Sequence, residues 1–286
     1  MAKQLHPSCI IPFERSMRIS SKIGFWGSGN MASAMMRRLL NKQVVKPQQL
    51  YCISEFGRGA GAFAKETGAN TCGNSSSDLI AASDILVLAF KPQQLETQAA
   101  QIAEINNRLV LSILAGTSLE KLKKHIPNAG ILVRTMPNTP GRIGEGLTAY
   151  CSRNQLENSD REALMAILGS LGEVIEIEEA LMDVHTAVSG SGPAYVFEMI
   201  AALAEAGEKE GLTPYLALKS AKQTVLGAAA LAKQADDPPE ELRNQVTSKG
   251  GTTAAGLQAM ADGNFRDLIH QTVREAKLRS IEMGKE

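Results

Sequence analysis

Residues 22–32, KIGFWGSGNMA, constrain the fold of this chain more than any other stretch. An apolar run that can form a strand ends in a turn with two glycines, and a segment that can form a helix follows. The turn and the first helical positions are Trp26, Gly27, Ser28, Gly29, Asn30 and Met31. Gly27 can adopt the unusual backbone angles of a tight turn, and Gly29 lets the backbone approach a pyrophosphate at the helix N-terminus. The stretch predicts the phosphate corner of a dinucleotide-binding fold, with an ordinary glycine-rich turn as the alternative.

Short apolar runs alternate with helical segments as far as about residue 177. The expected strands are residues 22–26, 50–54, 85–90, 109–113, 131–136, 147–151 and 174–177. The segments between them, among them residues 95–105, can form helices. Helical connections between strands imply an α/β domain with a doubly wound, mostly parallel sheet of the Rossmann type. We place this domain at residues 18–180, after an extension over residues 1–17 in which Met17 is a second candidate start.

From about residue 181 the chain becomes rich in alanine and helical in period. Helices are expected at residues 194–210, 214–234, 240–246, 253–261 and 264–283, which predicts an all-α domain over residues 181–286. Small side chains bury little area each, so five such helices would struggle to cover their apolar faces alone. We expect a second copy of the chain to cover them in a homodimer; packing on the first domain only is the alternative.

Composition argues against several classes of partner. The 30 basic and 30 acidic residues balance, and aromatic residues make up 4%, so neither charge nor stacking favours nucleic acid. No stretch reads as long and apolar enough to cross a bilayer, so we expect no membrane partner. Cys9, Cys52, Cys72 and Cys151 form no metal-binding pattern, and we interpret them as free thiols in a cytoplasmic protein.

Other polar residues follow the ends of the expected strands, where ligands bind in open α/β sheets. After the second strand, Ser54 and Arg58 favour the 2′-phosphate of NADP, whereas Glu55 favours the ribose of NAD. Solvated surface charges are the alternative interpretation of Glu55 and Arg58. Further strand ends carry Ala89, Lys91 and Pro92, then Ala115, then Asn138.

Two later segments combine glycines with hydroxyl side chains. Residues 189–195 connect the domains and can form either an anion-binding helix start or a hinge. Residues 246–253, VTSKGGTT, place hydroxyls and glycine N–H groups before a helix N-terminus, which can bind a carboxylate. A capped helix start is the alternative for this segment.

Several motifs together resemble pyrroline-5-carboxylate reductase, the last enzyme of proline biosynthesis. They include SGSGPAYVF at residues 189–197, QTVLGAA at 223–229 and VTSKGGTT at 246–253, in addition to the glycine turn and the strand ends. The resemblance runs in order from about Arg18 to the C-terminus. It implies a Rossmann domain that binds NADPH, with NADH as the alternative, and a helical domain that interlocks with its twin. It also implies a homodimer that several members of the family extend to a pentamer of dimers.

Carried over by position, the resemblance assigns cofactor and substrate residues. The cofactor positions are Trp26–Met31, Ser54, Ser76, Lys91, Ala115 and Asn138. The substrate-carboxylate positions, supplied by the partner chain, are Ser248, Gly250, Gly251, Thr252 and Thr253. Asp236 stands where the family commonly has a glutamate near the ring nitrogen, Lys249 where it has proline, and Ser76 where asparagine is frequent.

The implied reaction is transfer of a hydride to the C=N carbon of 1-pyrroline-5-carboxylate, which gives L-proline. A protonated imine needs positioning and charge neutralisation rather than a nucleophile, which agrees with a sequence that shows no catalytic triad. Water is the first candidate for the proton donor, and His185 and Tyr195 rank below it. One alternative is a reductase of the hydroxyacid or 6-phosphogluconate type, which would need a catalytic lysine near a Gly-rich turn of the helical domain, whereas Lys219 and Lys222 lie in a plain amphipathic pattern. The other is a non-catalytic dinucleotide-binding regulator, which would lose the substrate loop that this sequence keeps.

Overall fold

The structure is a computed structural model that describes residues 18–54 and 58–285. Contacts within the chain divide it into two compact units. The first unit reaches to Gly190 and also takes in the chain from Ala276 onward, and the second is Ser191–Glu275. The expected domain boundary between residues 180 and 181 stays a prediction, and the expected extension over residues 1–17 lies outside the described residues.

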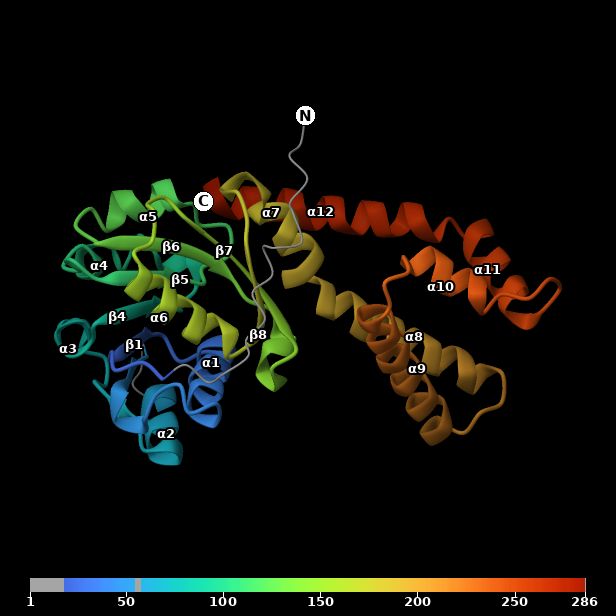
Figure 1. The fold of residues 1–286 in the computed structure, drawn as a ribbon, viewed down its shortest axis with the longest axis horizontal. Helices are drawn as coiled ribbons and strands as arrows, with labels where there is room; N and C mark the ends of the chain where they lie inside the picture. Colours follow the sequence, from blue (N-terminus) through green and yellow to red (C-terminus); the bar gives the residue numbers. More distant parts are fainter. Residues whose placement is uncertain (1–17, 55–57, 286) are drawn as a thin grey trace. The chain divides into compact units, whose positions relative to one another are not determined.

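The first unit is built on one sheet of eight strands in the order β3-β2-β1-β4-β5-β6-β7-β8 (Figure 1). All neighbouring strands are parallel except the β6–β7 pair, which is antiparallel. The strands are β1 (Ile23–Trp26), β2 (Leu50–Ile53), β3 (Asn70–Thr71), β4 (Ile85–Leu88), β5 (Leu109–Ser112), β6 (Ile131–Met136), β7 (Gly146–Ser152) and β8 (Gly172–Glu176). The doubly wound sheet predicted from the sequence is confirmed, and β3 was missed.

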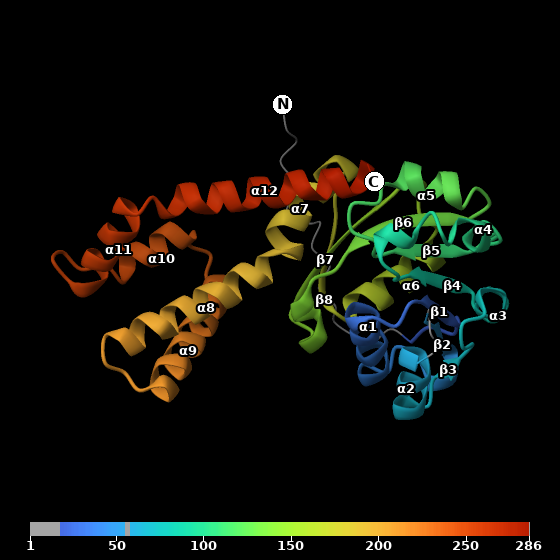
Figure 2. The same ribbon diagram turned by 180° about the vertical axis from the view of Figure 1, so that it is seen from behind.

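Helices cover both faces of this sheet (Figure 1 and Figure 2). One face packs on α1 (Asn30–Asn41), α2 (Arg58–Thr67) and α6 (Asn158–Gly169), and the other on α3 (Ser76–Ala82), α4 (Ala99–Ile102), α5 (Leu119–His125) and α7 (Met182–His185). Alternate residues of β4 point to opposite faces, with Val87 in one core and Leu88 in the other. Both faces of the sheet are therefore apolar, as expected for parallel strands.

Short helical turns complete the first unit at strand ends and connections. The 3₁₀ turns are η2 (Pro47–Gln49), η3 (Pro92–Gln94), η4 (Thr139–Ile143) and η5 (Glu179–Leu181), and a π-helical segment, η6, spans Thr186–Gly190. The region expected as one helix over residues 95–105 contains only the four residues of α4.

The described residues of the second unit are helical and bury few of their apolar side chains. Its helices are α8 (Gly192–Lys209), α9 (Pro214–Gln234), α10 (Pro239–Gln245), α11 (Thr252–Asp262) and the first part of α12 (Phe265–Lys285). Its buried cluster consists of Ala204, Ala217 and Ala221, while Phe197, Leu226 and Leu268 are each about 60% exposed. The five expected helices are all present, and their uncovered apolar faces agree with the expectation that a second copy covers them.

One expectation about membranes was wrong. The continuous helical run Glu179–Lys209 is long and apolar enough to cross a bilayer by length and composition, with a mean hydropathy of 1.2 in its most apolar window. The alanines of α8 raise the mean hydropathy without forming a uniformly apolar stretch. Length and composition alone are weak evidence for a membrane span, and the absence of a membrane partner stays a prediction.

Candidate functional site

The glycine turn after β1 is fixed by its neighbours on both sides. The N–H of Gly27 donates to the carbonyl of Ile53 at 3.1 Å, and the N–H of Ala89 donates to the carbonyl of Trp26 at 2.9 Å. Gly27 has a φ of +118°, and a Cβ on it would lie 2.5 Å from the carbonyl oxygen of Ala89. Only glycine fits this position, because the backbone of the β4 end occupies the space that a side chain needs.

Helix α1 begins at this turn with its N-terminal donors open. Gly29 is the N-cap residue, no described side chain caps the helix there, and its first turn contains no acidic residue. A Cβ on Gly29 would meet no described atom within 4 Å. The first N–H groups of a helix have no partner within the helix, and its dipole adds positive potential. The turn can therefore bind an anionic group such as a pyrophosphate.

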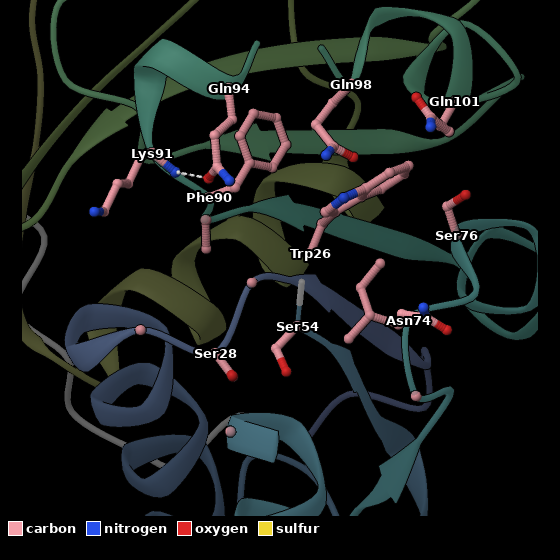
Figure 3. Close-up of a pocket in the computed structure, with 16 residues that line it drawn as sticks. Trp26, Ser28, Ser54, Asn74, Ser76, Phe90, Lys91, Gln94, Gln98 and Gln101 are labelled. Carbon is pink, nitrogen blue, oxygen red and sulfur yellow. Dashed lines mark hydrogen bonds between the residues drawn. The ribbon is translucent and has the colours of Figure 1, made fainter. Parts of the chain in front are cut away.

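A cavity of about 1150 Å³ opens beside this turn along the carboxyl edge of the sheet (Figure 3). The residues that line it and were predicted from the sequence are Trp26, Gly27, Ser28, Gly29, Ser54, Ser76, Ala89 and Lys91. They come from the ends of β1, β2 and β4 and from the start of α3. The fold thus brings together side chains that are up to 65 positions apart in the sequence, counted from Trp26 to Lys91.

Sequence reasoning missed several residues of the same cavity. These are Ile53, Gly59, Gly73, Asn74, Phe90, Gln94, Gln98 and Gln101. Gly73 and Asn74 follow β3, which is too short to be read as a strand. The three glutamines follow Lys91, with four positions from Gln94 to Gln98 and three from Gln98 to Gln101. Residues at this spacing lie on one face of a helix, and this pattern was the signal that could have identified them. In Figure 3, Gln98 lies above Trp26, and Gln94 lies beside the ring of Phe90.

Trp26 and Phe90 form an apolar wall of the cavity. Their ring centroids are 6.3 Å apart with an interplanar angle of 67°, an edge-to-face arrangement. Such pairs stabilise each other beyond the area that they bury. The tryptophan is almost completely buried, so the wall is part of the core as well as of the cavity.

Two hydroxyl groups lie at the β2 and α2 side of the cavity. Ser54 accepts a hydrogen bond from the N–H of Ala60 at 3.3 Å through its Oγ, and its own proton is thereby left for another acceptor. A Cβ on Gly59 would lie 2.5 Å from the Oγ of Ser28, so the absence of a side chain there makes room for this hydroxyl. Glu55 lies outside the described residues, and of Arg58 only the backbone, as the first residue of α2, is described.

Five other predicted cofactor residues are not among the described residues that line this cavity: Asn30, Met31, Pro92, Ala115 and Asn138. Asn30 and Met31 are the first residues of α1, and Pro92 opens η3, so these three adjoin lining residues in the chain. Ala115 lies in the connection between β5 and α5. Their roles stay predictions.

The side chain of Asn138 is occupied by neighbouring protein groups. Its Nδ2 donates to the carbonyl and to the Oγ of Ser189, at 3.3 and 3.2 Å, and its Oδ1 accepts from the N–H of Leu147 at 3.0 Å. These contacts tie the end of β6 to the start of β7 and to η6. A direct contact of this amide with a ligand would need one of them to be exchanged.

The predicted substrate residues lie in the second unit, at the two ends of α10. Asp236 is exposed in the connection between α9 and α10, and Ser248 and Gly250 lie between α10 and α11. The N–H of Gly251 donates to the carbonyl of Ser248 at 3.0 Å, which closes the turn before α11. Gly251 is the N-cap of α11, no described side chain caps it, and the first turn carries no acidic residue. This turn presents free N–H groups, as the turn before α1 does.

Burial favours the neutral forms of three titratable side chains in the first unit. Burial raises the pKa of Cys52 to about 11 and that of Cys151 to about 12, so both stay protonated thiols near neutral pH. Burial also lowers the pKa of His185, whose Nε2 has no hydrogen-bond partner among the described residues. Cys9 lies outside the described residues. Within residues 18–54 and 58–285, no three His, Cys, Asp or Glu side chains are grouped as metal ligands.

The parallel sheet, the glycine turn at an open helix N-terminus and the cavity along the strand ends together define a Rossmann-type dinucleotide-binding protein. Residues 22–116 match the family model described as NADP oxidoreductase coenzyme F420-dependent, and residues 179–283 match pyrroline-5-carboxylate reductase dimerisation.

Similar proteins give the family. A pyrroline-5-carboxylate reductase of Synechocystis is 40% identical over 93% of this chain and 100% of its own length. The solved structure of the Plasmodium falciparum pyrroline carboxylate reductase, with NADP bound, has a TM-score of 0.83 at 32% identity and covers 93% of this chain and 99% of that one. The structure of the Coxiella burnetii pyrroline-5-carboxylate reductase has a TM-score of 0.83 at 31% identity, and the match covers 94% of this chain and 100% of that one.

The chain belongs to the pyrroline-5-carboxylate reductase family of NAD(P)-dependent oxidoreductases. The resemblance drawn from the sequence motifs is confirmed, as are the fold class and the class of cofactor.

Proposed function

We propose that this protein reduces 1-pyrroline-5-carboxylate to L-proline with NADPH, with NADH as the alternative. The observation that supports this most directly is the pair of open helix N-termini, one before α1 in the dinucleotide unit and one before α11 in the helical unit. A dinucleotide and a small carboxylate are both anionic, and each turn offers unpaired N–H donors of the kind that bind such groups.

The residues of the first unit fit a dinucleotide. The turn from Gly27 to Gly29 gives the pyrophosphate a close approach to the backbone, because a Cβ is absent from both glycines. Ser54 and Ser76 offer hydroxyl groups to the adenosine side, and Trp26 closes the cavity with an apolar wall. When bound, NADPH supplies the hydride that reduces the C=N bond.

In the proposed mechanism, the protein positions the imine and balances its charges. The N–H groups and hydroxyls from Ser248 to Thr253 hold the carboxylate, and the Asp236 carboxylate stabilises the protonated ring nitrogen. Protonation at nitrogen makes the imine carbon a better hydride acceptor, so a nearby negative charge favours the reactive form. Water supplies the final proton, since the half-buried His185, whose pKa is lowered by desolvation, is poorly suited to donate one.

We also propose that two chains assemble through their C-terminal helices, so that each substrate turn serves the dinucleotide unit of the partner. The exposed apolar side chains of α8, α9 and α12 support this dimer, because leaving them in water would be unfavourable. We further propose that the protein is located in the cytoplasm and that five such dimers assemble into a decamer. Light scattering coupled to size exclusion would distinguish a monomer, a dimer and a decamer.

The test is a kinetic assay with both dinucleotides. The oxidation of NADPH and of NADH is followed by absorbance with 1-pyrroline-5-carboxylate as the substrate, and L-proline is measured by chromatography. An oxoacid, which a hydroxyacid dehydrogenase reduces with the same dinucleotide, and a reaction without imine serve as controls. Proline formed in proportion to dinucleotide oxidised supports the proposal, and oxidation with the oxoacid alone or with neither substrate contradicts it.

A further inference from the structure

The loop between β5 and α5, residues 113–118, follows the strand beside β4 and lies outside the residues that line the dinucleotide cavity. The strand order places β5 next to β4, with Leu88 paired to Ser112, and the N–H of Ile113 donates to the carbonyl of Leu88 at 3.1 Å. The β4 end supplies Ala89 and Lys91 to the cavity, whereas the adenosine side lies toward β2 and β3. This loop is therefore placed to meet the nicotinamide end of a dinucleotide.

The backbone of this loop packs directly on the last turn of α12. A Cβ on Gly116 would lie 2.9 Å from the carbonyl oxygen of Ser280 and 3.1 Å from the nitrogen of Gly284. A Cβ on Gly284 would lie 2.5 Å from the carbonyl oxygen of Gly116. Neither glycine has room for a side chain, so the peptide of the loop rests on the backbone of the helix.

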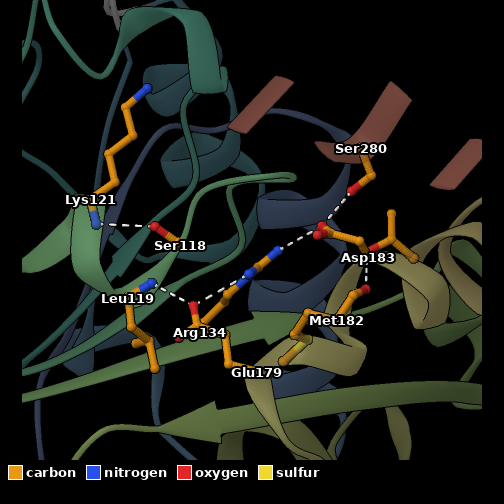
Figure 4. A network of polar contacts seen from close by, with 9 residues as sticks. Ser118, Leu119, Lys121, Arg134, Glu179, Met182, Asp183 and Ser280 are labelled. Carbon is orange, nitrogen blue, oxygen red and sulfur yellow. Dashed lines mark hydrogen bonds and ion pairs between the residues drawn. The ribbon is translucent and has the colours of Figure 1, made fainter. Parts of the chain in front are cut away.

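Polar contacts fix the position of this helical turn (Figure 4). The Oγ of Ser280 donates to Oδ1 of Asp183 at 2.8 Å, and the same oxygen pairs with Arg134 of β6 at 3.1 Å. Arg134 also pairs with Glu179 at 3.3 Å, and Glu179 accepts from the N–H of Leu119 at 2.7 Å. The guanidinium is almost completely buried, which makes its geometry well determined.

These contacts hold the loop at its C-terminal end and in its middle. At its C-terminal end, Leu119 is bound by Glu179, and in its middle, Gly116 rests on α12. Arg134 joins the two supports, since it binds Glu179 and Asp183 together. The last turn of α12 is thus linked to β6 and to the start of α5 by one connected network.

We propose that the last turn of α12, from Ser280 to Gly284, is a positioning element of the dinucleotide site, and that Gly284 is its positioning residue. By its contact with Gly116, the turn fixes how far the Ala115–Gly116 peptide extends toward the bound nicotinamide. This inference rests on the proposed function, because it assumes that the dinucleotide extends along the sheet edge to β5. Hydride transfer depends strongly on sub-ångström placement of the reacting carbon, so a displaced loop lowers the rate.

The substitution Gly284→Ala tests this role. Alanine favours a helix more than glycine does, so the helix itself is not weakened, but the new Cβ displaces the carbonyl of Gly116. The matched control is Gly61→Ala in α2, where an added Cβ would meet no described atom within 4 Å. We expect kcat to fall about tenfold for Gly284→Ala and to stay within about twofold of the original for the control.

A binding measurement separates positioning from general damage. The dissociation constants of NADPH and of adenosine 2′,5′-bisphosphate, its adenosine half, are measured by calorimetry without imine. We expect Gly284→Ala to weaken NADPH at least about threefold and the adenosine half less than about twofold. Equal weakening of both ligands, or no change in either, would overturn the proposal.

Two further arms keep the test decisive. If circular dichroism shows that Gly284→Ala is unfolded, Ser280→Ala replaces it, since it removes only the hydrogen bond to Asp183. The same selective loss of NADPH affinity is expected, and an unchanged affinity ratio would overturn the proposal. Because the binding arm needs no imine, a chain that binds NADPH but forms no proline contradicts the proposed function and leaves this inference to be decided by the ligand comparison.

Discussion

Replacing Gly27 by alanine should damage both the fold and the dinucleotide site. The φ of +118° is unfavourable for alanine by about 1–3 kcal/mol. The added Cβ would also lie 2.5 Å from the carbonyl oxygen and 2.6 Å from the carbonyl carbon of Ala89. Both are backbone atoms at the end of β4, so relief requires movement of a strand end, and overpacking of this kind costs about 1–3 kcal/mol.

The sum is a destabilisation of about 4 kcal/mol as a central value. A change of 1 kcal/mol shifts the melting temperature of a domain of this size by about 2–4 °C, so we expect a decrease of about 8–16 °C. The affinity for NADPH should fall as well, because the displaced turn carries the N–H groups that face the pyrophosphate.

Gly29→Ala is the matched variant in the same turn. Gly29 has a φ of −66°, which alanine adopts freely, and the added Cβ would meet no described atom within 4 Å. As an N-cap, alanine is less favourable than glycine by less than about 1 kcal/mol, so the melting temperature should change by at most about 4 °C. The Cβ would instead occupy the space through which a pyrophosphate approaches. Loss of a hydrogen bond to a charged group costs about 1.5–3 kcal/mol, which raises the dissociation constant of NADPH by about 10- to 100-fold.

The assay measures both quantities on the same samples. Thermal unfolding is followed by circular dichroism, and NADPH binding is followed by quenching of the single tryptophan, Trp26, which lines the cavity. If Gly29→Ala binds NADPH as the unmodified chain does, the pyrophosphate does not lie at this turn. If Gly27→Ala melts at the original temperature, the turn is not confined by Ala89 as argued.

Four further predictions follow from the structure and the family. Arg134→Met should lower the free energy of unfolding by about 2–4 kcal/mol in urea, because it leaves two carboxylates near a buried site, and an unchanged value would contradict the role of the ion pairs. The free energy of unfolding should fall as pH rises from about 9 toward 11, by up to about 1.4 kcal/mol per pH unit per thiol. The reason is that Cys52 and Cys151 ionise in the unfolded chain but not in the folded one. A variant with alanine at both positions should show a smaller dependence on pH. Thr253→Ala should raise the KM for the imine about tenfold with NADPH affinity nearly intact, and unchanged imine kinetics would remove Thr253 from the site. Arg58→Ala should weaken NADPH more than NADH, and equal losses would mean that Arg58 does not contact the 2′-phosphate.

Elements with a strong local pattern could be predicted from the sequence. The apolar period and the terminal signals of α9 gave its bounds, Pro214–Gln234, as the structure has them. The expected helix over residues 95–105 was wrong for a local reason. The Oε1 of Gln94 accepts from the N–H of Lys91 and the Oγ1 of Thr97 donates to the carbonyl of Gln94, so side chains compete there with helical hydrogen bonds.

Strand β3 could not be predicted because tertiary contacts create it. It has only two residues, and Asn70 is a poor strand former. The Nδ2 of Asn70 donates to the carbonyls of Gln48 and Leu50, at 3.0 and 3.2 Å, which holds the segment beside β2. Because Gly73 and Asn74 reach the cavity only through this pairing, the part of the site that follows β3 was missed together with the strand.

The candidate site also contains residues that a local sequence pattern predicts and residues that only the tertiary structure brings to it. The glycine turn is a local structure, so its residues could be named from eleven consecutive letters, 22–32. Gln98 and Gln101 reach the cavity only because η3 and α4 turn the chain back over the end of β4. Asn138 shows a different limit. Its position at a strand end predicts a ligand contact, which stays a prediction, and the hydrogen bonds of its amide to Ser189 and Leu147 could not be read from the sequence.

The apolar run Glu179–Lys209 is better explained by a dimer than by a bilayer. Its first part belongs to the first unit, where Asp183 binds the buried Arg134, so this part cannot lie in lipid without breaking that ion pair. The remainder, α8, has 18 residues, and it carries charges at Glu198 and Glu205. A span needs about 20 predominantly apolar residues. The exposed Phe197 and Leu203 fit the proposed dimer instead, because a second copy of helices rich in small residues can approach them closely. The match of residues 179–283 to a dimerisation family model agrees with this proposal.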